Sequence, residues 1–126
     1  MLAVKTYPAD YVASCRDRVH ALLDAYSGSD AFEPLFCDHV VLALDHYFVH
    51  RQRGMEGKDG NPANEVRLLA ESIAENDGVL RADKQIRLDP AASVLGLAAG
   101  DPIRLGVDDV RRLAGAYFDE IGRRFV

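Results

Sequence analysis

Three histidines with helical spacing are the side chains of this sequence best suited to chemistry. His39, His46 and His50 are separated by seven and four residues, so on a helix they fall within about 40° of one another. Imidazole nitrogens bind divalent metals and exchange protons near neutral pH, and a carboxylate from another segment can complete such a site. With Glu56 and Glu65 as the nearest carboxylates in the sequence, these five residues form a candidate divalent-metal or acid–base site.

A second interpretation is that the histidines belong to a protein core or to a dimer interface. Apolar residues share their face of the helix, namely Phe32, Leu35, Phe36, Leu42 and Ala43. A buried imidazole needs only a hydrogen-bond partner, which a hydroxyl, a carboxylate or a water molecule can supply. The segment from His46 to His50 reads HYFVH and lacks the glutamate of the HExxH metalloprotease motif. The sequence leaves both interpretations open.

A polar turn directly after the histidines contains a group of potential anion ligands. The stretch VHRQRGMEGKDGNPANEVRLL, residues 49 to 69, combines basic side chains, glycines and asparagines. Backbone N–H groups at the start of a helix, together with nearby cations, are typical of an anion site. The candidate ligand-binding residues are His50, Arg51, Arg53, Lys58, Asn61, Asn64 and Arg67.

The same turn has a purely structural interpretation. The carboxylates of Glu56, Asp59 and Glu65 could pair with the surrounding cations, while Asn61 and Asn64 act as helix caps and turn formers. The turn does not match the GxxxxGK[ST] phosphate loop, because Asp59 stands where the magnesium-binding hydroxyl is required. We therefore exclude a nucleotide hydrolase of that type.

Apolar residues at steps of three and four predict the helices that position these residues. The expected helices span residues 8–26, 33–53, 62–76 and 107–125. The alternating stretches QIRL and PIRL, at 85–88 and 102–105, predict a small two-stranded β-ribbon before the C-terminal helix. The expected fold is mainly α, a single helical domain of residues 1–126 with a four-helix core and this ribbon.

The second expected helix is apolar around most of its circumference. Its solvent-like positions form one line, Asp38, Asp45 and Gln52, and the three histidines face away from that line. We therefore expect the histidines to be shielded and the helix to be enclosed by its own chain or by a second copy. A homodimer is the expected assembly.

Composition and charge argue against several classes of protein. The chain has 126 residues, 48% of them hydrophobic, and a net charge of −5, which disfavours binding to nucleic acids or to membrane surfaces. The stretch MLAVKTYPADY lacks the basic-then-apolar layout expected of a signal peptide, and no apolar run approaches the roughly 20 residues of a membrane helix. These features predict a cytoplasmic protein, in which Cys15 and Cys37 are buried reduced thiols.

The pattern HRxRxxEGKDGNPxNEVRLL from His50 to Leu69, together with IRLDPxxSVLGL at 86–97, resembles a family of short bacterial proteins of unknown function. The resemblance implies a compact, mainly helical bacterial protein, and it implies no substrate, cofactor or catalytic residue. The leading hypothesis is a non-catalytic, self-associating protein with a small-ligand or anion pocket around residues 46–67. The alternative is a metal-dependent or acid–base enzyme that uses the three histidines with Glu56 or Glu65.

Overall fold

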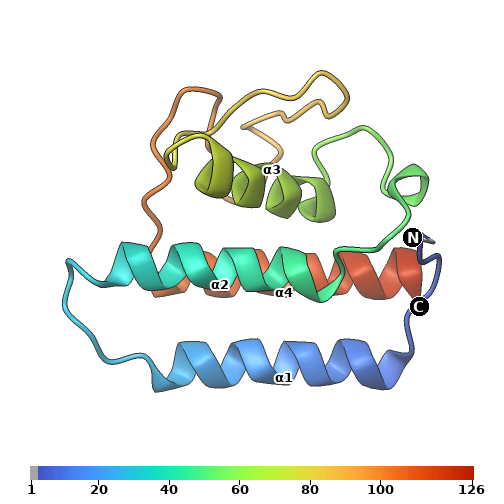
Figure 1. Ribbon diagram of the computed structural model, residues 1–126, viewed down its shortest axis with the longest axis horizontal. Helices are drawn as coiled ribbons and strands as arrows, with labels where there is room; N and C mark the ends of the chain where they lie inside the picture. Colours follow the sequence, from blue (N-terminus) through green and yellow to red (C-terminus); the bar gives the residue numbers. More distant parts are fainter. Residues whose placement is uncertain (1–2) are drawn as a thin grey trace.

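Four α-helices make up most of the computed structural model, which describes residues 3–126 (Figure 1). They are α1 (Ala9–Ala25), α2 (Glu33–Tyr47), α3 (Pro62–Glu75) and α4 (Val107–Phe125), and a short 3-10 turn spans Arg53–Met55. α2 and α4 lie side by side, with α1 on one side of the pair and α3 on the other. α2 and α4 each contact all three other helices, so this pair forms the centre of the fold. Within the described residues, no helix has the length and apolar character needed to cross a bilayer.

Side-chain caps determine where α3 and α4 begin. The Asn61 side chain accepts hydrogen bonds from the backbone N–H groups of Ala63 (3.0 Å) and Asn64 (3.2 Å), and a proline follows it at the first helical position. At the start of α4, the Glu33 carboxylate accepts a hydrogen bond from the N–H of Val107 at 2.7 Å. A side chain in the first turn of α2 therefore also fixes the first turn of α4.

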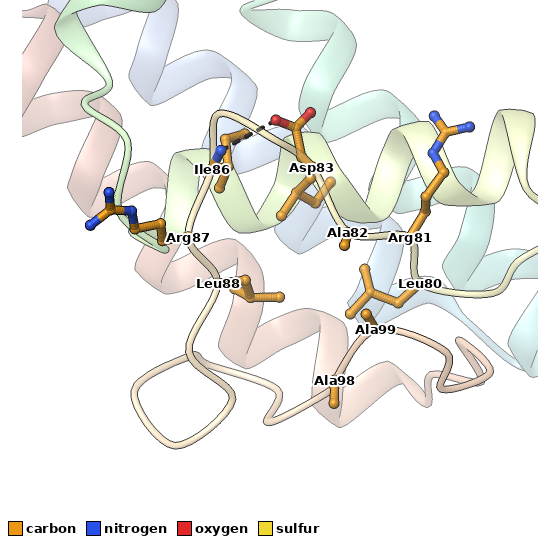
Figure 2. A pocket seen from close by; sticks show the side chains of 10 residues that line it. Leu80, Arg81, Ala82, Asp83, Ile86, Arg87, Leu88, Ala98 and Ala99 are labelled. Atoms are coloured by element: carbon orange, nitrogen blue, oxygen red, sulfur yellow. Dashed lines mark hydrogen bonds between the residues drawn. The ribbon is translucent and has the colours of Figure 1, made fainter.

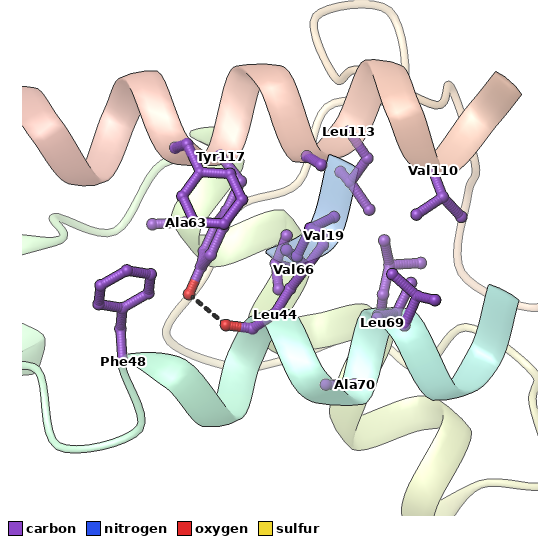
Figure 3. Close-up of a cluster of buried hydrophobic side chains, with 14 of the residues drawn as sticks. Val19, Leu44, Phe48, Ala63, Val66, Leu69, Ala70, Val110, Leu113 and Tyr117 are labelled. Atoms are coloured by element: carbon purple, nitrogen blue, oxygen red, sulfur yellow. Dashed lines mark hydrogen bonds between the residues drawn. The ribbon is translucent and has the colours of Figure 1, made fainter. Parts of the chain in front are cut away.

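The hydrophobic core fills the space between the helices, with aromatic side chains from α4 and from the end of α2 (Figure 3). The largest fully buried side chains include Tyr117, Phe48, Phe118, Phe125, Leu44 and Leu69. Burial of one such apolar side chain contributes about 1.5–3 kcal/mol. The Tyr117 hydroxyl crosses from α4 to α2 and donates a hydrogen bond to the Leu44 carbonyl at 3.0 Å. This bond satisfies the polar end of a side chain that is otherwise packed as a hydrophobic one.

α2 ends earlier than the sequence predicts. The expected helix continued to Arg53, whereas the chain leaves the helix at Phe48, whose ring packs in the core. The next residues pair with the N-terminal segment: the N–H of Val4 donates to the His50 carbonyl (2.6 Å), and the N–H of Gln52 donates to the Val4 carbonyl (2.8 Å). The helical expectation is wrong after Tyr47 because these backbone groups bond to a segment distant in sequence instead of continuing the helix.

The expected two-stranded ribbon is also wrong, because residues 3–126 contain isolated β-bridges and no sheet. The N–H of Arg87 donates to the Lys58 carbonyl at 2.7 Å, and the N–H of Ile103 donates to the Gly78 carbonyl at 2.7 Å. The two alternating stretches thus pair with the loops before and after α3 and not with each other. The chain between α3 and α4 wraps around α3 as a result (Figure 1).

Candidate functional site

A buried ionic network lies where the turn after α2 meets α3 and α4. The Arg51 side chain has no solvent exposure, and its Nε–H donates to Glu56. The remaining guanidinium donors bond at 3.1–3.3 Å to the acceptors Phe48 O, Tyr117 Oη, Asp45 Oδ1 and Ala63 O. A guanidinium has five N–H donors, so each one has a protein acceptor here. Full satisfaction of these donors is what makes the burial of this cation tolerable.

Glu56 is the carboxylate at the centre of this network. Its side chain is 1% exposed and accepts hydrogen bonds from Arg51 and from both Nε (3.2 Å) and Nη2 (2.5 Å) of Arg67. With Asp45 included, two cations face two carboxylates, so the formal charges of the network cancel. The structural interpretation of the turn is therefore confirmed for Glu56, Arg51 and Arg67.

Electrostatics keep Arg51 charged and Tyr117 neutral. Burial alone lowers the pKa of Arg51, but the Tyr117 phenol and the carboxylates of Glu56 and Asp45 raise it more, so the net pKa is above its ordinary value. Burial also raises the pKa of Tyr117, and the phenol therefore keeps its proton and can donate to Leu44.

The two asparagines of the turn are structural residues. Asn61 Nδ2 donates to the Glu56 carbonyl (2.5 Å) and to Asp59 Oδ1 (2.9 Å), and Asn64 Nδ2 donates to the carbonyls of Gly57 (3.2 Å) and Asp59 (2.8 Å). These bonds fold the turn back onto the first residues of α3. The interpretation of both residues as caps and turn formers is confirmed.

Two cations of the turn lie outside the network. Arg53 and Lys58 are exposed and line a surface hollow of about 240 Å³ together with Gly54, Gly57, Gln85 and Ile86. Across residues 3–126, neither cation forms an ion pair, and the N–H groups of Gly54 and Gly57 donate no hydrogen bond. We name this feature the basic hollow. Its lining includes two cations and two glycines and contains no carboxylate, although the Asp59 carboxylate lies beside Gly57.

A second hollow, of about 210 Å³, shares Ile86 with the basic hollow (Figure 2). Its wall is mainly apolar, and the apolar lining residues are Leu68, Leu80, Ala82, Ile86, Leu88, Ala98 and Ala99. Among the polar residues that line it, Asp83 accepts hydrogen bonds from the N–H groups of Gln85 (2.7 Å) and Ile86 (3.2 Å), and Arg81 pairs with Glu75 (3.0 Å). Asp83 therefore holds in place the short segment that separates the two hollows.

The seven residues that the sequence suggested as anion ligands have different environments in the structure. Arg51 and Arg67 are bound to Glu56, and the two asparagines build the turn. Only Arg53 and Lys58 line the basic hollow, while His50 is exposed elsewhere. Sequence reasoning missed Gln85 and Ile86, because no local pattern shows that the chain beyond α3 returns to residue 58.

His39 and His46 lie on the exposed side of α2, and His50 is exposed beyond its end, whereas Asp38 and Asp45 are partly buried. Within a single chain the imidazoles are therefore not shielded, so the prediction of enclosure by the same chain is wrong. Asp45 faces inward because it bonds to Arg51. In a helix that is apolar around most of its circumference, the periodicity does not determine which polar line faces solvent.

The carboxylates suggested as metal ligands have other partners. Glu56 is bound to two arginines, and Glu65 is buried and accepts hydrogen bonds from the N–H groups of Val94 (2.9 Å) and Leu95 (3.0 Å). In the part of the chain that the structure describes, no group of three or more His, Cys, Asp or Glu side chains is placed to hold a metal ion. The five residues proposed from the sequence as a metal or acid–base site are not brought together.

Both cysteines are unpaired and buried, as the sequence predicts. Burial raises the pKa of both thiols, and it raises that of Cys37 to about 11. At neutral pH the thiols are therefore protonated and weakly nucleophilic.

Comparisons of this chain with family models, curated proteins and solved structures find no match. The resemblance to short bacterial proteins stays a prediction, and the functional argument rests on the geometry described above.

Proposed function

We propose that this protein is a non-catalytic binding protein that takes up a small anion, such as phosphate or a short dicarboxylate, in the basic hollow. One observation carries the proposal: four basic side chains lie on or next to the turn, and only two of them are neutralised internally. Glu56 binds Arg51 and Arg67, while Arg53 and Lys58 remain unpaired in the lining of a single hollow.

The chemistry of the lining favours an anion over a neutral ligand. Hydrogen bonds from charged donors to an anionic oxygen are roughly twice as strong as bonds between neutral groups. The N–H groups of Gly54 and Gly57 supply neutral donors beside the two cations, in the manner of backbone anion sites. A hollow of about 240 Å³ is suited to a small anion and too small for a typical drug-sized ligand.

The surrounding groups support binding without catalysis. A general base must be free to accept a proton from the ligand. The buried carboxylate of the turn, Glu56, is held by two arginines, and Asp59 is hydrogen-bonded to Asn61. The polar side chains close to the hollow therefore serve to hold the turn.

A thermal-shift titration tests this function. At constant ionic strength, phosphate or succinate should raise the melting temperature progressively, because a ligand that binds only the folded protein stabilises it by RT ln(1 + [L]/Kd). Arg53→Ala combined with Lys58→Ala should abolish the rise. Arg104→Ala is the control, since Arg104 is an exposed arginine that does not line the hollow, and its shift should equal that of the wild type.

Two results would contradict the proposal. One is the absence of a shift with phosphate, sulfate and short dicarboxylates alike. The other is a shift of equal size in the double variant, which would show that the anions act elsewhere or through general salt effects. Isothermal titration calorimetry on the same proteins gives the stoichiometry directly, and the expected value is one anion per chain.

A further inference from the structure

One side of α2 is largely exposed and carries no formal charge. It consists of Leu35, His39, Leu42 and His46 on the helix, with Phe32 directly before the helix and Val49 two residues past its end, and we call it the outer α2 face; Leu42 is half-buried against the core and the other five residues are exposed. Phe32, Leu35 and Val49 are 50%, 57% and 43% exposed. The solvent side of a surface helix normally carries charged residues, and a grouped apolar exposure marks an interaction site.

The spacing of this face is that of a helix-to-helix seam. Its members follow one another at intervals of three, four, three, four and three residues. This alternation is the a/d pattern by which two helices pack side by side, with the first member of each pair at a and the second at d. The other sides of α2 contact α1, α3 and α4. The outer α2 face therefore makes no helix-to-helix contact within the described part of one chain.

We propose that the outer α2 face binds the same face of a second copy of this chain, with the two α2 helices antiparallel. In this alignment every a position meets a d position. On the helix, Leu35 faces His46 of the second copy, and His39 faces its Leu42. The two-fold axis then passes between His39 and Leu42, and each contact occurs twice, as an isologous dimer requires.

Charge complementarity supports a second copy in this orientation. A chain with a net charge of −5 repels its own copies in general, but the outer α2 face brings no charged residue into the contact. Along the sequence, the exposed Asp30 precedes the face, and the first exposed charged residue after it is Arg53. An antiparallel pairing places the acidic end of one copy beside the basic end of the other, and it also opposes the two helix dipoles.

Sedimentation equilibrium of the wild type and of two lysine variants tests the surface. The wild type should show a concentration-dependent dimer, and Leu35→Lys should raise its dissociation constant by about tenfold or more, because a lysine must be desolvated in the seam. Leu22→Lys is the matched control, since Leu22 is 42% exposed on α1 and should leave the dimer unchanged. Circular dichroism should show native helix content in both variants.

Cysteine cross-linking tests the orientation. Leu35→Cys and His46→Cys are prepared as separate proteins, oxidised alone and oxidised as an equal mixture. An antiparallel pairing predicts a disulfide-linked dimer only in the mixture, because two copies of either position alone lie about 16 Å apart along the helix. The native cysteines are fully buried and should not interfere.

Several outcomes would overturn the proposal. A wild type that stays monomeric at all concentrations would leave the outer α2 face to a different partner. An unchanged dimer in Leu35→Lys, or a dissociated one in Leu22→Lys, would place the contact elsewhere. Self-cross-linking of Leu35→Cys without the mixture would show a parallel pairing.

Discussion

Arg51 and Arg53 are close neighbours in the sequence and have opposite environments. Arg51 is fully buried with every N–H donor bonded, while Arg53 is exposed in the lining of the basic hollow. The difference arises because the backbone around Arg51 pairs with Val4, which turns the arginine side chain towards Asp45, Glu56 and Tyr117. A buried cation is stable only with such a set of partners.

Loss of Arg51 should therefore be costly. Arg51→Ala leaves the buried Glu56 with one arginine partner instead of two and empties the site, and we expect the free energy of unfolding to fall by about 3–5 kcal/mol. Urea unfolding followed by circular dichroism measures this loss. Arg111→Ala removes the exposed ion pair with Asp24 and should cost at most about 1 kcal/mol. Equal losses in the two variants would contradict the role of the network.

At this residue scale, the sequence predicted the participants of the network but not their partners. The density of charge in the turn indicated either an internal ionic network or an anion site. The structure contains an ionic network, and two cations of the turn, Arg53 and Lys58, lie outside it. The separation of Arg51 from Arg53 depends on Val4, and the lining contributed by Ile86 depends on a hydrogen bond between Arg87 and Lys58. Such contacts between distant segments leave no local signal in the sequence.

At the scale of elements, the predicted helices agree best with the structure where a cap marks their ends. Asn61 caps the start of α3, and Asp108 and Asp109 lie in the first turn of α4, where negative charge suits the helix dipole. α2 has no comparable signal at its end, because Phe48 leaves the helix in order to pack in the core. Tertiary packing overrides local propensity at that point.

Two glycine substitutions, one at the start of α4 and one within it, should have opposite effects on the free energy of unfolding. A Cβ atom at Gly106 would meet Glu33 Oε2 at 2.9 Å, whereas one at Gly115 would meet nothing within 4 Å. Gly106→Ala should displace the Glu33 cap from Val107 and cost about 0.5–2 kcal/mol. Gly115→Ala should stabilise α4 by about 0.5–1 kcal/mol. Thermal or urea unfolding of both variants measures the difference.

A double-mutant cycle identifies the cause of the first effect. If Gly106→Ala acts through the Glu33 cap, it should cost much less in a Glu33→Ala background than in the wild type. The same cost in both backgrounds would show that the glycine matters for another reason.

At the scale of the whole molecule, one buried carboxylate ties the long connection between α3 and α4 to the helical core. Glu65 on α3 accepts hydrogen bonds from the N–H groups of Val94 and Leu95, about thirty residues further along the chain. Burial raises the pKa of Glu65 above its ordinary value of 4.5, and these two hydrogen bonds lower it by less. The folded protein therefore binds this proton more tightly than the unfolded chain does.

This shift predicts a pH dependence of stability. The contribution of Glu65 is largest below pH 4.5 and is lost as the pH rises through its higher folded-state pKa, because the unfolded chain releases the proton first. Relative to Glu65→Gln, the wild type should therefore lose stability as the pH is raised from 4 towards 7. Urea unfolding at a series of pH values measures the difference, and groups common to both proteins cancel.

Glu120→Gln is the control with the opposite sign. Burial raises the pKa of Glu120, but hydrogen bonds from Arg123 and Arg124 outweigh burial and lower it below 4.5. Relative to this variant, the wild type should lose stability as the pH falls below 4.5. A pH-independent difference between the wild type and Glu65→Gln would contradict the assignment for Glu65.

The hydrogen bonds that hold the turn also affect how the basic hollow would bind an anion. The backbone of the turn is held by Asn61, Asn64 and the Arg124 side chain, which donates to the Met55 carbonyl at 3.1 Å. Conformational freedom of this backbone is thus given up when the chain folds and not when a ligand arrives. Such preorganisation spares association the entropic penalty of ordering a mobile loop. Substitution of Asn61, Asn64 or Arg124 should consequently weaken affinity even though none of these side chains lines the hollow.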